Sequence, residues 1–337
     1  MTLDYLCYMS SNRNLHAEFL QAWRSGQDEF VMQTSGSTGN PNQMTWKREH
    51  MIWSAEQTLA AFFNCCQDLS QLCVLPLDKA GGLMQAVRAE VWGTPIEVRE
   101  ARSLPQLEGQ FSIVSLTPMQ LHQVVQSPQG IRQLLGFHTI LLGGGPIDAT
   151  LEARLKEPDL MPVRFIHTFG MSETYSHFAG RIIGDTPSIY RVLKGYEWKI
   201  DDEMLSVKSP VTEQKWLETR DRVRADANGF TWLGRADFVA NSGGIKLSIE
   251  SIEFAISAHL GWPLTDFFVW KIPDPVLGEA LVLAHTRQDA VEKTPDWSFL
   301  PPYHKPKCLY HCPHPAFANG KWLRVASFAR SKLLELK

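Results

Sequence analysis

The sequence predicts an α/β protein with one large and one small domain. Three apolar segments, at Leu72–Leu75, Ile113–Pro118 and His138–Ile147, begin like buried strands and end in proline or glycine turns. From Ser188 to Phe230, short alternating strands follow one another between charged turns, which indicates a small antiparallel β-subdomain. A chain of 337 residues is long enough to bury a large core and to form two domains.

Helices and further strands follow from the spacing of the apolar residues. Helical spacing predicts helices over Asn14–Trp23, Trp46–Phe63 and Ser251–His259. We expect Thr45 to cap the second of these helices. In the last hundred residues, two apolar segments predict strands, at Phe267–Trp270 and Ala280–Ala284.

The overall composition narrows the class of protein. Apolar residues make up 44% and charged residues 20% of the chain, as in an ordinary globular protein. The net charge of −3 gives no electrostatic reason to expect nucleic acid or an anionic membrane as a partner. The sequence contains neither a membrane-spanning apolar run nor a signal peptide, and its six cysteines are irregularly spaced. We therefore expect a cytoplasmic protein with reduced thiols.

A run of hydroxyl residues and glycines, Q-T-S-G-S-T-G-N-P-N over residues 33–42, follows the apolar Phe30–Met32. Its glycines allow a tight turn close to an anion, and its N–H and O–H groups can converge on phosphate oxygens. The lysine that follows the second glycine of a Walker loop is missing here. The alternative interpretation is a flexible Ser/Gly linker.

This run resembles the phosphate-binding loop of the AMP-forming adenylating enzymes, which include acyl-CoA synthetases, peptide-synthetase adenylation domains and firefly luciferase. The family typically has T-S-G-S/T-T-G-x-P-K there, so Asn42 replaces a lysine. Other motifs of the family follow in order as far as Arg324. The resemblance implies that ATP phosphates are bound by Thr34, Ser35, Gly36, Ser37, Thr38 and Gly39.

The segment 163–174 is similar to the family's Y-G-x-T-E motif. The resemblance implies that Phe169, which replaces the tyrosine, stacks on adenine beside Gly170. By the same match Ser172 offers its hydroxyl to the α-phosphate, and Glu173 holds Mg2+, a cation that prefers oxygen ligands.

Two further stretches match parts of the family's nucleotide site. The turn at Gly144 and Gly145 lies against adenine in relatives; the alternative is a simple strand-to-helix turn. Thr219–Asp221 resembles T-G-D, in which the aspartate binds the ribose hydroxyls, so Asp221 is expected to bind ribose. Arg220 replaces the family's glycine.

Residues 76–83 resemble the family's P-L-x-H-x-x-G-L, which lines the acyl pocket. Lys79 occupies the position of the histidine, and Gly81 and Gly82 follow it. A cation there would recognise an anionic acyl substrate. The alternative is a solvated loop lysine.

Residues 232–253 closely resemble the family's hinge motif. The match implies that Arg235 contacts ribose or phosphate and that Asp237 is the hinge. Gly243 and Gly244 would leave room for the pantetheine arm of coenzyme A.

The ending Asn319–Arg324 is similar to N-G-K-x-x-R, which makes Lys321 the expected catalytic lysine. The resemblance thus implies a large N-terminal α/β domain over residues 1–236, truncated relative to the family. A mobile, small α+β C-terminal domain follows over residues 237–337, joined to the first by the hinge.

These matches predict an AMP-forming acid–CoA ligase that uses ATP, Mg2+ and coenzyme A. The short length and pocket are most similar to o-succinylbenzoate–CoA ligases of menaquinone synthesis. Two alternatives stay open: a ligase for another aromatic or aliphatic acid, and a non-catalytic nucleotide- or acyl-binding relative. The expected partners are these small molecules, and a homodimer is possible.

Overall fold

The computed structural model describes residues 11–35, 41–63, 68–288, 290, 295–318 and 321–334. The chain forms two compact units. The first contains Met1–Gly144, Leu155–Lys199 and Ser206–Leu217, and the second contains Gly145–Arg154, Ile200–Leu205 and Glu218–Lys337. The mixed α/β class predicted from the sequence is confirmed, whereas the expected domain boundary at Asp237 stays a prediction.

The first unit is built on a seven-stranded sheet with the order β4-β3-β5-β6-β7-β8-β9. Its first five strands are mutually parallel, β8 pairs antiparallel with β7, and β9 pairs antiparallel with β8. The bounds are β3 Gln71–Cys73, β4 Ile96–Val98, β5 Ile113–Leu116, β6 Thr139–Leu142, β7 Arg164–Gly170, β8 His177–Ile182 and β9 Arg191–Val192. The apolar strands expected from the sequence are therefore present, and β3, β5 and β6 are buried along their whole length.

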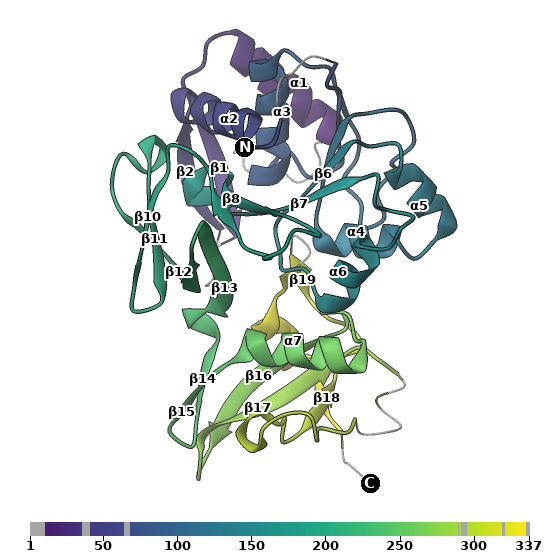
Figure 1. Ribbon diagram of the computed structural model, residues 1–337, viewed down its shortest axis with the longest axis vertical. Helices are drawn as coiled ribbons and strands as arrows, with labels where there is room; N and C mark the ends of the chain where they lie inside the picture. Colours follow the sequence, from purple (N-terminus) through teal and green to yellow (C-terminus); the bar gives the residue numbers. More distant parts are fainter. Residues whose placement is uncertain are drawn as a thin grey trace, which may run out of the picture. The chain divides into compact units, whose positions relative to one another are not determined.

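Helices α2 and α3 lie side by side in this unit (Figure 1). The Trp92 indole of α3 donates to the Ala55 carbonyl of α2 over 3.0 Å, which ties the two helices together. The helices are α1 Asn12–Arg24, α2 Arg48–Phe62, α3 Ala80–Trp92, α4 Pro118–Val124, α5 Pro128–Leu134 and, in the sequence of the second unit, α6 Ala149–Leu155.

The start of α2 differs from the sequence prediction. Thr45 and Trp46 belong to strand β2 (Pro41–Lys47), which pairs antiparallel with β1 (Glu29–Ser35). The N-cap of α2 is Lys47, which makes no side-chain cap bond, so Thr45 is not the cap. The prediction was wrong because the buried Trp46 continues the apolar spacing of the helix while pointing inward from a strand.

A four-stranded antiparallel sheet follows, as expected from the alternating segments, with the order β10-β11-β12-β13. Its residues are shared between the two units. The strands are β10 Glu197–Asp201, β11 Met204–Lys208, β12 Leu217–Asp226 and β13 Gly229–Arg235.

The second unit also contains a mixed sheet covered by helix α7 (Ile249–Leu260), as Figure 1 shows. Ile252 and Ile256 of α7 pack with Phe267, Val269 and Leu283 in one buried cluster. The expected helix and strands are present. The sheet runs β15-β14-β17-β18-β21, and β16 also pairs with β17. The bounds are β14 Val239–Ser242, β15 Ile245–Ser248, β16 Phe267–Asp274, β17 Gly278–His285, β18 Leu309–His311 and β21 Lys332–Leu333.

Candidate functional site

The expected phosphate loop lies largely outside the described residues. This holds for Gly36, Ser37, Thr38 and Gly39, while only the backbone of Thr34 and Ser35 is described, at the end of β1. β1 and β2 pair up to the Ser35–Pro41 position, so the loop connects two adjacent strands. Its role as a phosphate site stays a prediction.

Glycines follow two neighbouring parallel strands, β6 and β7, at their carboxyl ends. A Cβ on Gly143 would lie 2.9 Å from the Thr168 hydroxyl, and one on Gly170 would lie 2.1 Å from the Ser176 carbonyl oxygen. Gly144 has φ +86°, whereas a Cβ on Gly145 would meet nothing within 4 Å. Open α/β sheets bind ligands at this edge. The close backbone approach explains why Gly170 cannot carry a side chain, whereas a side chain at Gly143 would displace the Thr168 hydroxyl.

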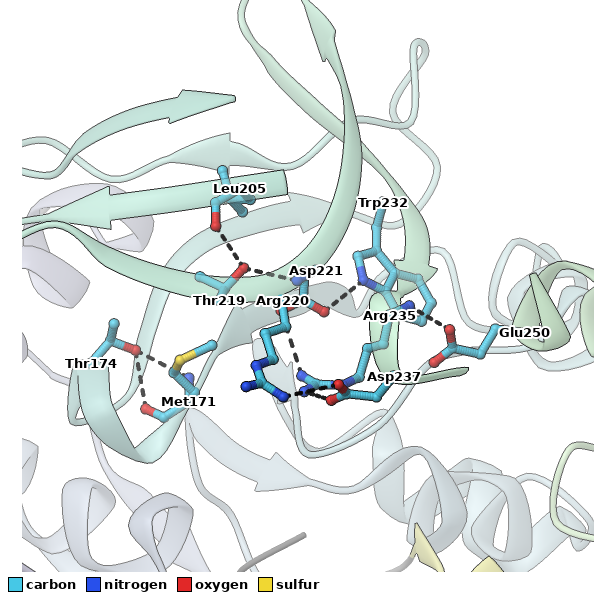
Figure 2. A network of polar contacts seen from close by, with 10 residues as sticks. All are labelled: Met171, Thr174, Leu205, Thr219, Arg220, Asp221, Trp232, Arg235, Asp237 and Glu250. Atoms are coloured by element: carbon cyan, nitrogen blue, oxygen red, sulfur yellow. Dashed lines mark hydrogen bonds and ion pairs between the residues drawn. The ribbon is translucent and has the colours of Figure 1, made fainter. Parts of the chain in front are cut away.

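The next turn contains the two residues expected at the α-phosphate and the metal. Ser172 and Glu173 lie in a single 3₁₀ turn, η2 (Ser172–Thr174), which Thr174 closes by accepting from the Met171 N–H over 3.1 Å (Figure 2). Phe169, just before it, packs its ring 5.1 Å from Tyr190.

The exposed Glu173 carboxylate has no ion pair or hydrogen bond among the described residues. The described side chains contain no cluster of three or more potential metal ligands. Mg2+ usually takes one or two carboxylates together with substrate phosphates, so a single free carboxylate fits it.

The expected role of Lys79 in an acyl pocket stays a prediction, and the structure shows the local surroundings of its charge. Lys79 precedes α3 and pairs with Asp78 over 3.0 Å, so its charge already has a local partner. A Cβ on Gly82 would lie 2.2 Å from the Pro76 carbonyl oxygen, and one on Gly81 would lie 3.1 Å from Leu75. The Pro76 backbone therefore occupies the space that a side chain at position 82 would need.

The sequence analysis missed Arg88, a buried cation within α3. Arg88 is only 3% exposed and donates from Nη2 to the Ser176 hydroxyl over 2.6 Å. Burial lowers the pKa of its guanidinium to about 10. Its Nε has no hydrogen-bond partner, and no carboxylate of the described residues pairs with it. The available signal was local: Arg88 stands directly between the apolar residues Val87 and Ala89.

In the second unit, Asp221 and Arg235 lie close to each other (Figure 2), while their expected contacts with the nucleotide stay predictions. The buried Asp221 accepts from the Trp232 indole over 3.0 Å and lies 3.8 Å from Arg235. Arg235 also pairs with Asp237 over 2.7 Å, and Arg220 pairs with Asp237 over 3.2 Å. Asp221, which is expected to bind ribose, and Asp237, the expected hinge, therefore both pair with Arg235.

Glu250 joins this cluster and was not predicted. Its carboxylate accepts from the backbone N–H of Arg235, and a Cβ on Gly234 would lie 2.6 Å from it (Figure 2). Burial, helped by nearby Glu253 and Asp221, raises the pKa of Glu250 to about 7. A carboxyl that titrates near neutral pH therefore holds the backbone two residues before Asp237.

Three residues near the expected hinge have unusual backbone conformations: Arg220, which replaces a glycine of the family motif, and the pair Gly243 and Gly244. Arg220 has φ +59°, the left-handed conformation that the family's glycine adopts freely. Gly243 and Gly244 both have positive φ and form the two-residue turn between β14 and β15, as type I′ hairpins require. The geometry of the hairpin alone accounts for this glycine pair, so its contact with coenzyme A stays a prediction.

Lys321 lies in the short strand β20 (Lys321–Trp322), paired with β19 (Phe317–Ala318), but its side chain is outside the described residues. The segment after it is anchored by Arg324, at the start of α9 (Arg324–Ala329). Arg324 forms two bonds, of 2.8 and 2.9 Å, with the buried Glu253 carboxylate.

Similarity to known proteins shows the family to which the chain belongs. The model of the AMP-binding enzyme family matches residues 18–213, more than half of the chain. The chain belongs to the AMP-binding enzyme family. No described helix has the length and apolar content that a membrane span would need.

Several members of the AMP-binding family are similar over most of the chain. A 2-succinylbenzoate–CoA ligase of Listeria monocytogenes is 27% identical over 72% of this chain and 56% of its own length. One from Enterococcus faecalis is 26% identical over 91% of this chain and 70% of its own length. The chain thus spans little more than half of the Listeria relative.

Two solved structures have the same fold. An acyl-CoA synthetase (AMP-forming)/AMP-acid ligase II-like protein from Dyadobacter fermentans covers 94% of both chains, with a TM-score of 0.63 and 28% identity. The o-succinylbenzoate-CoA synthetase MenE of Bacillus subtilis, with its acyl-adenylate intermediate, covers 91% of this chain and 70% of its own, with a TM-score of 0.72 and 19% identity.

Proposed function

We propose that this chain is an AMP-forming acid–CoA ligase for an aromatic acid with a second carboxylate, such as 2-succinylbenzoate. Membership of the AMP-binding family and the relatives named 2-succinylbenzoate–CoA ligase support the reaction class. Its cofactor and co-substrates would be Mg2+, ATP and coenzyme A.

The observation that carries the substrate class is Arg88. A buried charge without a partner costs several kcal/mol, about 3–5 by the usual effect of removing one member of a buried pair. No described carboxylate offsets this cost at Arg88, and its Nε is unsatisfied. A carboxylate of the substrate supplies both the opposite charge and the missing acceptor. Lys79, already paired with Asp78, needs no such ligand.

In the first step, one carboxylate oxygen of the acid attacks the α-phosphorus of ATP, and the bond to the bridging oxygen of pyrophosphate breaks. Lys321 would bridge the two anions and stabilise the charge that develops at phosphorus. The Thr34–Gly39 loop would hold the leaving pyrophosphate by its N–H and O–H groups. Mg2+ held by Glu173 would supply charge neutralisation at the phosphates.

In the second step, the thiol of coenzyme A loses its proton and attacks the acyl carbonyl, and AMP leaves. Asp221 would hold the ribose during both steps. Because the two steps need different groups at one carbonyl, Asp237 would act as the hinge that exchanges Lys321 for the Gly243–Gly244 turn. The ion pairs of Asp237 with Arg235 and Arg220 support this role, since exposed pairs rearrange at low cost.

The test is product formation from the purified protein with ATP, Mg2+, coenzyme A and 2-succinylbenzoate, followed by mass spectrometry. We expect the acyl-CoA and AMP from the wild type and almost none from Lys321→Ala. AMP formed only with other acids of a panel would overturn the substrate and keep the ligase. ATP binding without AMP formation from any acid would support the non-catalytic alternative, which Asn42 favours by removing a loop cation.

A further inference from the structure

Arg88 is the first member of a chain of buried and part-buried polar contacts within the first unit, here called the Arg88 relay. Its members are Arg88, Ser176, His177 and Thr58. The Ser176 hydroxyl lies 3.2 Å from Nδ1 of His177, and the Thr58 hydroxyl lies 3.0 Å from Nε2. Thr58 in turn donates to the Ser54 carbonyl over 3.0 Å. Thr58 and His177 are almost completely buried.

The proton positions follow from the donor and acceptor capacity of each group. Arginine only donates, so the Ser176 oxygen accepts from Arg88 and its own proton goes to Nδ1 of His177. Nδ1 is then an acceptor, and the proton of a neutral imidazole must lie on Nε2, which donates to Thr58. The Thr58 proton completes the chain at Ser54. Every bond in this direction is satisfied with His177 uncharged.

A charged His177 would contradict this pattern. The ring would then carry a proton on Nδ1 as well as on Nε2, and the Nδ1 proton would face the proton of the Ser176 hydroxyl. The ring would also place a buried positive charge near Arg88. Burial, with a further contribution from the Arg88 charge, lowers the pKa of His177 well below its usual value. The ring also packs against Phe62, whose centroid is 5.5 Å away. The ring is therefore both neutral and fixed in orientation.

We infer that His177 and Thr58 are positioning residues for the substrate's second carboxylate, because they orient Ser176 and thereby the Arg88 guanidinium. This inference rests on the proposed function. Two helices and a strand hold the relay: Thr58 on the buried face of α2, Arg88 on α3 and His177 at the start of β8. A guanidinium recognises a carboxylate through the direction of its N–H groups, so rotation of the fork weakens binding without affecting the reacting carboxylate.

The test compares Thr58→Val, which removes the hydroxyl at nearly constant shape, with Thr58→Ser, which keeps it. Three acids are used: 2-succinylbenzoate, 4-oxo-4-phenylbutanoate without the ring carboxylate, and 2-butyrylbenzoate without the chain carboxylate. We expect Thr58→Val to raise the KM for 2-succinylbenzoate about tenfold. In Thr58→Val, the KM for ATP should stay unchanged, and so should the KM for the one single-carboxylate acid that still carries the reacting carboxylate. We expect Thr58→Ser to behave like the wild type.

Ser176→Ala keeps the inference testable if Thr58→Val does not fold, and it should show the same selective rise in KM. A fall in kcat shared by all acids, or equal KM values for Thr58→Val and Thr58→Ser, would overturn the positioning role. An inactive wild type would instead overturn the proposed function.

A second readout is the histidine-ring nitrogen spectrum, with the His177 signals assigned by their loss in His177→Gln. The relay requires a neutral ring protonated at Nε2 throughout the neutral pH range. A ring that is protonated at Nδ1, or that titrates there, would contradict the inferred proton order.

Discussion

Each unit contains an arginine that is largely shielded from solvent, Arg88 in the first and Arg324 in the second, and the two have opposite surroundings. Arg324 forms a two-bond pair with Glu253 and lies 4.4 Å from the Phe238 ring centroid. Arg88 donates to a neutral serine and has no described carboxylate partner. A charge that is neutralised within the fold serves the structure, whereas a buried charge left without a counter-ion indicates a place for an anionic ligand.

The strongest effect on stability is expected at the paired arginine. Arg324→Met leaves the Glu253 carboxylate buried without its cation, so the free energy of unfolding should fall by about 3–5 kcal/mol. Urea unfolding measures this loss. The double variant Arg324→Met with Glu253→Gln should recover a large part of it, because no uncompensated charge remains. A single variant as stable as the wild type would contradict the assigned role of the pair.

A pH-dependent effect of similar size is expected at Glu250. Its folded pKa of about 7 is raised from an ordinary value of 4.5, so the folded state binds the proton more tightly than the unfolded state. Its contribution to stability is complete below pH 4.5 and disappears as pH rises through about 7, a loss on the order of 3 kcal/mol.

Glu250→Gln removes this titration and keeps an oxygen for the Arg235 N–H. We expect the variant to match the wild type near pH 5 and to be more stable at pH 8, measured by urea unfolding at both values. Parallel stability curves for the two proteins would show that Glu250 does not titrate as stated.

The smallest effect is expected at Arg220, the exposed arginine that pairs with the expected hinge residue Asp237. Arg220→Gly removes a left-handed residue, which relieves about 1 kcal/mol of strain, and it loses an exposed ion pair worth about 0–1 kcal/mol. The net change in unfolding free energy should be at most about 1 kcal/mol, detectable as a small shift in Tm. A large loss would mean that the Arg220–Asp237 pair stabilises the fold more than an exposed pair does.

The sequence predicted the elements that a regular local pattern of apolar residues marks. Buried parallel strands are nearly continuous apolar runs, so β5 and β6 were recognised from local sequence. Trp46 was misplaced because a strand residue that points inward can extend a helix-like spacing. The family motifs located Asp221, Arg235 and Asp237, which the structure joins in one network.

Arg88 and Glu250 could not be located in this way. A basic residue on a helix usually faces solvent, and only the packing of α3 shows that Arg88 is buried without a carboxylate. The role of Glu250 likewise depends on a contact with the backbone of Arg235, fifteen residues earlier. Both depend on which elements meet in space, which residue spacing does not encode.

The most direct test of the central claim is Arg88→Met, measured for both stability and substrate recognition. Replacing an uncompensated buried charge by an apolar side chain should raise the free energy of unfolding by about 1–4 kcal/mol. The same variant should raise the KM for 2-succinylbenzoate by about 100-fold, equivalent to about 2.7 kcal/mol, while KM for ATP is unchanged. A variant that is less stable and binds the dicarboxylate as well as the wild type would show that Arg88 serves the fold and not the substrate.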